Sequence, residues 1–382
     1  MIQAPVAALS VHFADLEDPR VERTKEHPLI NIVTIAICSV ICGANGWVDM
    51  EVFGNAKQAW LATFLDLKNG IPSHDTFGRV FGMLDPAQFE SCFVSWIQAI
   101  AKLTNGEVIA IDGKCLRRSH DKTAGKKAIY MVSAWASTNH LVLGQKKVAE
   151  KSNEITAIPK LLEVLEIANC IVTIDAMGCQ TEIAKIIVKQ KKADYVLALK
   201  KNQGNLYEDV AAVFAYAEKE NYKNIVHDFH KTVGKDHGRI ETRYCWSIDV
   251  SEWEEHIRNC AAWVGIKSIV KITAKRQVGG VVTLETRYFI SSLESNATQA
   301  LHAVRTHWSI ENSLHWVLDI AFREDDSRVR KGNSDHNLAI LRHIALNLLK
   351  QEKTGQGGIQ ARRLRSGWDE KYLLRVLGGF AT

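Results

Sequence analysis

The spacing of apolar residues changes along the chain. From residue 1 to about 105, apolar positions recur at helical intervals and predict a helical N-terminal domain. Ser73 and the pair Asp85-Pro86 are typical helix starts. The expected helices are His27–Ala44, Val48–Leu67, His74–Leu84 and Pro86–Leu103. They form either a helix-turn-helix-like DNA-binding unit or a plain helical cap, and no base-reading residue stands out.

Residues 106–202 alternate between short apolar runs and helical segments. Three expected strands are followed by a helix, a strand, a second helix and a last strand. This order predicts an α/β fold with a mixed sheet and helical cover, and it matches a ribonuclease H-like core. The segments are Glu107–Lys114, Ala128–Thr138, Leu141–Ala149, Glu154–Ile167, Cys170–Ala176, Thr181–Lys191 and Tyr195–Lys200.

The remaining third of the chain divides into three expected parts. Residues 203–295 begin with a helix and continue as a β-rich, antiparallel insertion, which we expect to protrude from the sheet rather than extend it. Residues 296–352 return to helical spacing and would complete the core. Residues 353–382, which include the glycine-rich stretch at 354–358, are predicted to form a basic C-terminal tail.

Charge is uneven along the chain although the net charge is only +5. Between residues 112 and 202 there are 16 lysines and arginines against 9 acidic residues, and between 340 and 382 there are 8 against 3. A basic core and tail fit a polyanionic partner, although a solvated surface explains the charge equally well.

Cysteine spacing and hydropathy restrict the class of protein. None of the eight cysteines forms a C-x-x-C pair, which argues against a zinc site of the usual spacing and favours reduced core thiols. No signal peptide is evident. The most apolar stretch, Leu29–Cys42, is too short to span a bilayer and is predicted to be a buried helix. We therefore expect a cytoplasmic protein with no membrane partner.

Two buried strands are expected to end on an aspartate. Asp112 follows Val108–Ile111, and Asp175 follows Cys170–Ile174, with glycine close behind each. A carboxylate at the rim of an apolar layer is costly unless a cation or hydrogen bonds compensate it. Ligands of open α/β sheets gather at such strand ends. Two acids there suggest a divalent metal and phosphodiester chemistry; taken singly, each would more often be a turn cap.

A third acid is expected from a later helix. Glu311 lies beside an apolar stripe, with His307 and His315 four residues to either side on the same column. Imidazole suits zinc better than Mg²⁺, so we favour phosphate contact or hydrogen bonding to Glu311 over metal ligation. Trp308 and Trp316 could stack on a flipped base, but tryptophans at this spacing are more often core residues.

At these residues the chain closely resembles the transposases of the ISAs1 family and the H-repeat-associated proteins, which are DDE-type enzymes. The resemblance covers nearly the whole chain, and the matching motifs occur in the family's order. They are Gly70–Thr76, Val108–Lys114, Glu150–Pro159, Thr173–Gln180, Lys200–Gly204, His307–Asn312 and Leu314–Asp319.

The resemblance implies a DDE triad of Asp112, Asp175 and Glu311 on a ribonuclease H-like fold. It implies Mg²⁺, replaceable by Mn²⁺, as two ions about 3.5–4 Å apart that serve end cleavage and then strand transfer. The partners would be double-stranded transposon ends and target DNA, bound by a homo-oligomer at the bacterial nucleoid. The residues predicted to contact DNA are Lys114, Lys200, Lys201, His307, His315 and Trp308.

Some features depart from the pattern or leave alternatives. A wider signature, Tyr-x2-Arg-x3-Glu-x6-Lys, is replaced by Val304, His307 and Leu318 around the glutamate. Glu154 is either an accessory acid or, as we prefer, a favourable charge at a helix start. The acids at 324–326 could reach the metals, but we expect a solvated turn. The competing functions are a domesticated, inactive DNA-binding relative and a simple nuclease; the intact triad argues against the first.

Overall fold

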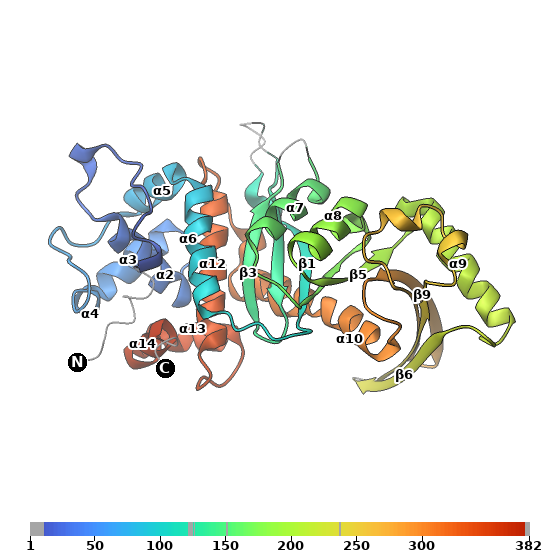
Figure 1. Ribbon diagram of the computed structural model, residues 1–382. Coiled ribbons are helices and arrows are strands. Elements are labelled where there is room, and N and C mark those ends of the chain that lie inside the picture. The colour runs from blue at the N-terminus through green and yellow to red at the C-terminus, as the bar shows by residue number, and fades with distance from the viewer. Residues whose placement is uncertain (1–10, 121–124, 126, 150–151, 237, 379–382) are drawn as a thin grey trace.

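The computed structural model describes residues 11–120, 125, 127–149, 152–236 and 238–378, and it is a mixed α/β structure built on one large sheet (Figure 1). The sheet has nine strands in the order β3-β2-β1-β4-β5-β9-β8-β7-β6. Their bounds are β1 (Val108–Cys115), β2 (Tyr130–Ala136), β3 (Leu141–Lys147), β4 (Ile171–Ile174), β5 (Asp194–Leu199), β6 (His227–Asp236), β7 (Arg239–Asp249), β8 (Ser268–Val278) and β9 (Val281–Ser291).

The first five strands form the mixed part of the sheet. Strand β1 pairs antiparallel with β2 and parallel with β4, β2 pairs antiparallel with β3, and β4 pairs parallel with β5. All five were predicted from their apolar runs. In the parallel strands these runs are nearly continuous because both faces are covered by helices.

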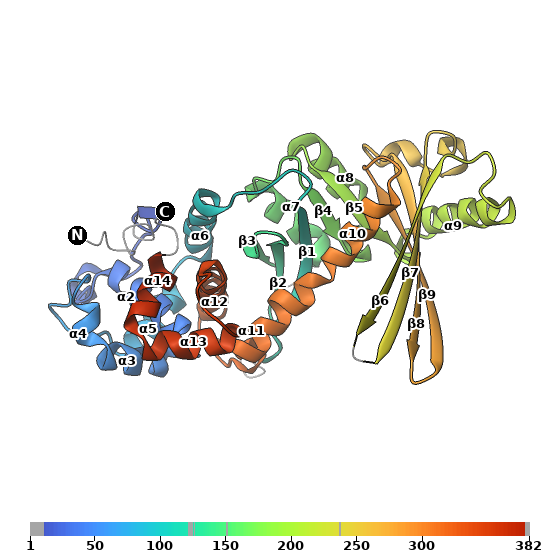
Figure 2. The same ribbon diagram turned by 90° about the horizontal axis from the view of Figure 1, so that it is seen from below.

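Helices cover the two faces of these strands. Helices α7 (Glu154–Val164) and α8 (Thr181–Lys185) lie over one face, and α10 (Ala297–His307) lies on the other. Odd- and even-numbered residues of β1 face different helices. A Cβ on Gly113 would meet Glu154 of α7, whereas Val108 packs in a cluster with Ala300 and Leu301 of α10. Figure 2 shows α10 running on through a π-helical turn (Glu311–His315) into α11 (Trp316–Ala321).

The segment between β5 and α10 extends the sheet. It contains α9 (Gly204–Lys219) and strands β6 to β9, and β9 pairs antiparallel with β5 from Val196 to Leu199. The expectation that residues 203–295 stand apart from the sheet was therefore wrong. Strand β6 was also missed, because it is a largely exposed edge strand without a clear alternation of apolar residues.

The N-terminal helices surround the long helix α12 (Ser334–Gln351), which contacts α2, α5 and α6 and also β3. As predicted, Ser73 and Asp85 cap the starts of α5 and α6. The bounds are α2 (Leu29–Ile41), α3 (Trp47–Ala56), α4 (Gln58–Leu61), α5 (His74–Met83) and α6 (Pro86–Ile100). Helix α2 is buried, and no described helix has the length and apolarity needed to cross a membrane.

The C-terminal residues fold onto the same helices. They form α13 (Ile359–Trp368) and α14 (Glu370–Gly378), and both contact α12. The buried guanidinium of Arg363 donates to the carbonyls of Val40 and Ala44. The positive charge of this segment is thus partly used inside the fold rather than offered to a partner.

Candidate active site

The two aspartates lie at the same level of neighbouring parallel strands. Asp175 directly follows β4, as predicted, but Asp112 lies inside β1, which continues to Cys115, so the expectation that it ends its strand was wrong. Ile111 of β1 pairs with Ile174 of β4, so the next residue on each strand is an aspartate at the same level of the sheet. Asp175 ends its strand and accepts a hydrogen bond from Met177 N at 3.0 Å, so it also caps the turn that follows. Sequence and register together therefore place the two residues side by side on adjacent strands.

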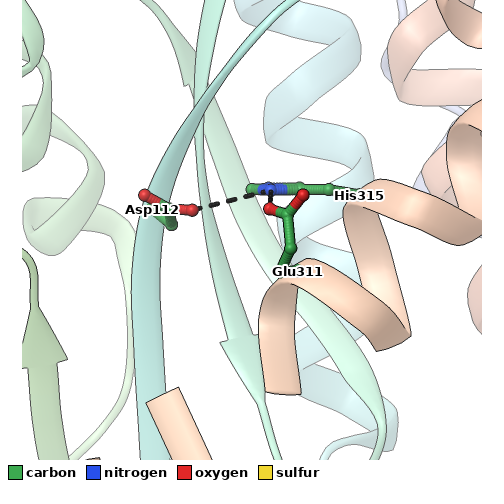
Figure 3. Close-up of side chains that lie close together, drawn as sticks. All are labelled: Asp112, Glu311 and His315. Atoms are coloured by element: carbon green, nitrogen blue, oxygen red, sulfur yellow. Dashed lines mark hydrogen bonds and ion pairs between the residues drawn. The ribbon is translucent and has the colours of Figure 1, made fainter. Parts of the chain in front are cut away.

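Glu311, in the π-helical turn that follows α10, lies close to Asp112 of β1 (Figure 3). His315 lies between them: its Nδ1 is 3.1 Å from Glu311 Oε2 and 3.6 Å from Asp112 Oδ2. The imidazole therefore donates to Glu311, one of the two roles that we preferred for it. One ligand atom from each of these residues lies within 4.8 Å of the others, which is close enough to share a cation.

A π-helical turn places Glu311 and His315 together. They are the first and last residues of that turn, and π-turns inside α-helices are frequent at functional sites. Glu311 is largely exposed, whereas His315 is buried. The exposed carboxylate of Glu311 can therefore move toward a ligand, while the buried ring of His315 stays in place.

The electrostatics of this cluster favour a cation. Burial, followed by the charges of Asp175, Glu154 and Glu311, raises the pKa of Asp112 to about 7. Burial and the charge of Asp175 also raise the pKa of Glu154. Burial therefore contributes more to the raised pKa of Asp112 than repulsion among the acids.

Asp175 lies outside the tightest group of ligand atoms. The loop that carries it is held by two side chains of the Lys200–Gly204 motif. Asn202 Nδ2 donates to Ala176 O at 2.6 Å, and Gln203 Nε2 donates to Cys179 O at 2.8 Å. The sequence marked this motif only for its lysines, whereas its amides fix the position of Asp175.

Glu154 belongs to the neighbourhood of the acids. A Cβ on Gly113 would come within 2.2 Å of its Oε1, so glycine at position 113 leaves room for this carboxylate directly behind Asp112. It also begins α7, as expected. The sequence offered both roles for Glu154, and the structure makes them compatible.

The helix that carries Glu311 is anchored at one end to β4. His307 Nδ1 lies 3.1 Å from Thr173 Oγ1, two residues before Asp175. Burial lowers the pKa of His307 to about 4, so the ring is neutral at pH 7. A buried, neutral histidine with a protein partner does not fit the phosphate contact that we expected. It positions the helix instead.

The other end of this helical path is anchored to β1 by Lys114. Its Nζ lies 2.5 Å from Asp319, 2.9 Å from Glu324 and 3.5 Å from Asp325. Glu324 is only 3% exposed and also pairs with Arg342 at 3.6 Å. Lys114 is thus surrounded by carboxylates, which does not fit the expected phosphate contact, and the solvated turn expected around Glu324 was wrong.

Of the remaining predicted DNA contacts, His315 is buried, which does not fit a phosphate contact, and the other three are accessible. Lys200 and Lys201 directly follow β5 and are exposed. Trp308 and Trp316 are 52% and 58% exposed, so the preferred core interpretation was wrong for both. Trp308, with Arg287 stacked 5.0 Å from its ring centre, and Lys200 both line a cavity of about 260 Å³ that also includes Asp175.

A groove of about 720 Å³ borders the Glu311 helix on the side of strands β7 to β9. Its walls include Trp308, Ser309 and Asn312, together with two glutamates. We call it the arginine groove, after Arg239, Arg243, Arg276, Arg287 and Arg305. Sequence reasoning missed it because these arginines are spread over four elements and meet only after β9 has joined the sheet.

Comparisons with known proteins agree with this geometry. A family model described as "Transposase DDE domain" matches residues 104–348, and a second, described as "DDE_Tnp_1-associated", matches residues 10–97. The chain belongs to the DDE transposase family. Its function is therefore DNA transposition, and the family resemblance expected from the motifs is confirmed.

Bacterial relatives extend over the whole chain. "Putative transposase YncI" of Escherichia coli O157:H7 is 40% identical over 385 residues, covering 99% of this chain and 97% of that protein. "H repeat-associated putative transposase YhhI" of Escherichia coli K12 is 40% identical over 375 residues, covering 97% and 98%. A solved piggyBac transposase synaptic complex with hairpin DNA aligns over 96% of this chain and 80% of its own, at 11% identity and a TM-score of 0.46.

Proposed function

We propose that this transposase cuts its element's ends and joins them to target DNA at a divalent-metal site formed by Asp112, Asp175 and Glu311. The observation that carries the proposal is the meeting of Asp112 and Glu311 across 199 positions of sequence, with Asp175 on the adjacent strand. Strands β3-β2-β1-β4-β5, with β2 antiparallel to its neighbours, support a ribonuclease H-like core built from residues 106–202 and 296–352.

The donor set fits a hard cation such as Mg²⁺ or Mn²⁺. Mg²⁺ is bound through oxygen atoms, and carboxylates supply them here. His315 donates a hydrogen bond from Nδ1 to Glu311, so on that side the ring orients an acid rather than ligating a metal. Burial, more than repulsion among the acids, raises the pKa of Asp112, so a bound cation would stabilise the ionised form of this carboxylate.

Each side chain has a distinct task in this mechanism. Asp112 and Asp175 hold fixed positions on the sheet, and Glu311 completes the site from the helix that His307 and Lys114 dock onto it. When bound, the metal lowers the pKa of an attacking water and stabilises the leaving oxygen. The same carboxylates serve strand transfer, since they hold the metal and not a particular nucleophile.

The surroundings of the acids support DNA as the substrate. The arginine groove provides guanidinium groups that match phosphate geometry. Lys200 and Lys201 add exposed charge beyond Asp175. Trp308 is proposed to stack against a base near the cut. A homo-oligomer bringing two transposon ends together is part of the same proposal.

Cleavage of a duplex that carries the inverted repeats flanking the gene tests this function. In Mg²⁺ and in Mn²⁺, Asp112→Asn, Asp175→Asn and Glu311→Gln should each abolish cutting while leaving the circular dichroism spectrum unchanged. Glu182→Gln, which neutralises an exposed carboxylate of α8, is the control and should cut normally. Normal cutting by Asp112→Asn or Asp175→Asn would refute the assignment. Failure of the native protein to cut under every condition would favour the domesticated alternative.

A further inference from the structure

A second basic hollow lies on the other side of the core, away from the arginine groove. It occupies about 1,200 Å³ between α3, α5, the end of β3 and the segment before α12. Asp75 is the one carboxylate among the described residues that line it. We call it the basic cleft, after its cationic lining of His74, Arg79, Lys147, Arg328, Arg330 and Lys331.

Three of the cations that line this cleft are not consumed by the fold. Arg79, Arg328 and Lys331 are exposed, and within the described ranges none of them forms an ion pair. Arg79 makes only a long contact of 3.5 Å to Thr76 Oγ1. Lys114, by contrast, has three carboxylates within 3.5 Å. Like charges gathered in one hollow repel each other, so an anion in the cleft would relieve that repulsion.

The walls of the cleft are fixed in place. Asn333 N donates to Gly82 O at 3.0 Å, and Asn337 Nδ2 donates to Phe81 O at 2.8 Å, so the segment before α12 is tied to the end of α5. Gly332 adopts φ +56°, and a Cβ there would come within 2.3 Å of Gly82 O. A cleft built this tightly presents its cations without a large ordering cost on binding.

Strand register relates the cleft to the acids. Asp112 is level with Ser133 and Gln145 across β2 and β3, and Lys147 lies two residues beyond Gln145 on the same face. Two strand spacings and two residues correspond to about 12 Å between the backbones at Asp112 and Lys147. A duplex advances about 3.4 Å per base pair, so DNA held at the acids would reach the cleft within about four base pairs.

The cleft suits a duplex better than a single strand. Single-strand sites combine cations with aromatic rings on which bases stack. Among the described residues that line the cleft, Trp47 is the one indole or phenyl ring. It is stacked on Phe81 with an interplanar angle of 5°, and its edge lies against Gly78. The His74 ring is hydrogen-bonded to Glu51 at 2.6 Å. The cleft therefore offers mainly charge, with little ring surface for stacking.

We propose that the basic cleft binds the phosphate backbone of duplex DNA beside the scissile bond and so fixes the substrate's path across the acids. This inference rests on the proposed function, since it requires DNA at the acids. Phosphate contacts carry no sequence information, so the cleft positions the duplex and leaves choice of sequence to other surfaces.

The test compares two double variants of the full-length protein. Arg79→Ala/Lys331→Ala removes two cations from the cleft. Lys160→Ala/Lys189→Ala removes two exposed cations, neither of which has an ion-pair partner among the described residues, from α7 and the π-turn after α8 on the opposite face, and it matches the change in net charge. Fluorescence anisotropy would follow binding of a mixed-sequence 30-bp duplex and of its 30-nucleotide single strand between 50 and 300 mM NaCl, in EDTA.

The cleft variant should bind the duplex with a slope of log affinity against log salt that is shallower by about 1.8, because each phosphate contact contributes about 0.9. Extrapolated from 1 M, this corresponds to about 30-fold weaker binding at 0.15 M salt. The control variant should keep the native slope. An unchanged slope in the cleft variant, an equal loss in the control, or a loss confined to the single strand would overturn the proposal.

Failure of the cleft proposal can be distinguished from failure of the proposed function. Asp112→Asn should keep the native slope in EDTA because it leaves the cleft intact, and its cleavage reports on the proposed function alone. A cleft variant with native binding refutes the cleft whether or not the acids prove catalytic.

Discussion

Glu324 offers a prediction whose size can be worked out from its contacts. Burial disfavours its charged form, but Lys114 and Arg342 outweigh burial and lower its pKa from 4.5 to about 2. A difference of that size corresponds to about 3 kcal/mol in favour of the ionised carboxylate in the folded protein. Glu324→Gln keeps the shape and removes the charge, so it should lower the free energy of unfolding at pH 7 by about 3 kcal/mol.

The pH dependence supplies an internal check with a defined sign. The folded pKa is lowered, so this stabilisation is present above pH 4.5 and is lost as the pH falls from 4.5 toward 2. Urea unfolding followed by tryptophan fluorescence should therefore show the gap between native protein and Glu324→Gln narrowing between pH 5 and pH 3. A gap that stays constant over that range would refute the ion-pair explanation.

A neighbouring acid provides the matched control. Asp326 lies in the same turn but is about half exposed, and it pairs with Arg118 and Arg323 near the surface. Asp326→Asn should cost less than about 1 kcal/mol, as exposed pairs do. If it destabilised the protein as much as Glu324→Gln, the turn as a whole and not the buried network would hold the helix to β1.

Three further predictions concern the site and its DNA surface. Because the pKa of Asp112 is about 7 without metal, Mn²⁺ affinity measured by calorimetry should fall as the pH drops below 7, with proton release on binding; constant affinity from pH 6 to 8 would contradict this. His307→Phe and Thr173→Val should each cost about 1 kcal/mol of stability, and the double variant should cost less than their sum if the two side chains share one hydrogen bond; simple additivity would contradict the docking role. Arg276→Ala/Arg305→Ala should weaken duplex binding and flatten its salt dependence, whereas native binding would remove the arginine groove from the DNA path.

The sequence predicted those parts of the fold whose signals are local. Apolar runs located the strands of the mixed sheet, and the capping residues Ser73 and Asp85 located the starts of α5 and α6. The register of parallel strands then made Asp112 and Asp175 neighbours, because each directly follows a paired residue. Helical spacing singled out Glu311 as a candidate and the family resemblance assigned it to the triad, but no local pattern could place it beside the aspartates.

Sequence reasoning was wrong where distant segments meet. Lys114 was interpreted as a phosphate contact. Its carboxylate partners could not be foreseen, because they lie 205 to 211 positions away in the sequence. The pairing of β9 with β5 could not be predicted from alternation within either strand. The helical spacing of Trp308 predicted a core position, yet its side chain is about half exposed.

The structure also changes how the N-terminal helices should be tested. Removing residues 1–105 would strip α2, α5 and α6 from the buried faces of α12, which follows the Glu311 helix in the chain. Loss of DNA selection by such a truncation would therefore not separate recognition from folding. Point variants of exposed residues on those helices keep their buried contacts and make that separation.

We propose that three acids, distant in sequence, share one divalent-cation site. Anomalous diffraction from crystals of the protein soaked in Mn²⁺ tests it most directly. We predict a manganese peak in contact with carboxylate oxygens of Asp112 and Glu311, with Asp175 ligating the same ion or an adjacent one. A peak at the Asp319–Glu324 network instead, or a saturating soak that leaves Asp112 and Glu311 without manganese, would contradict the account.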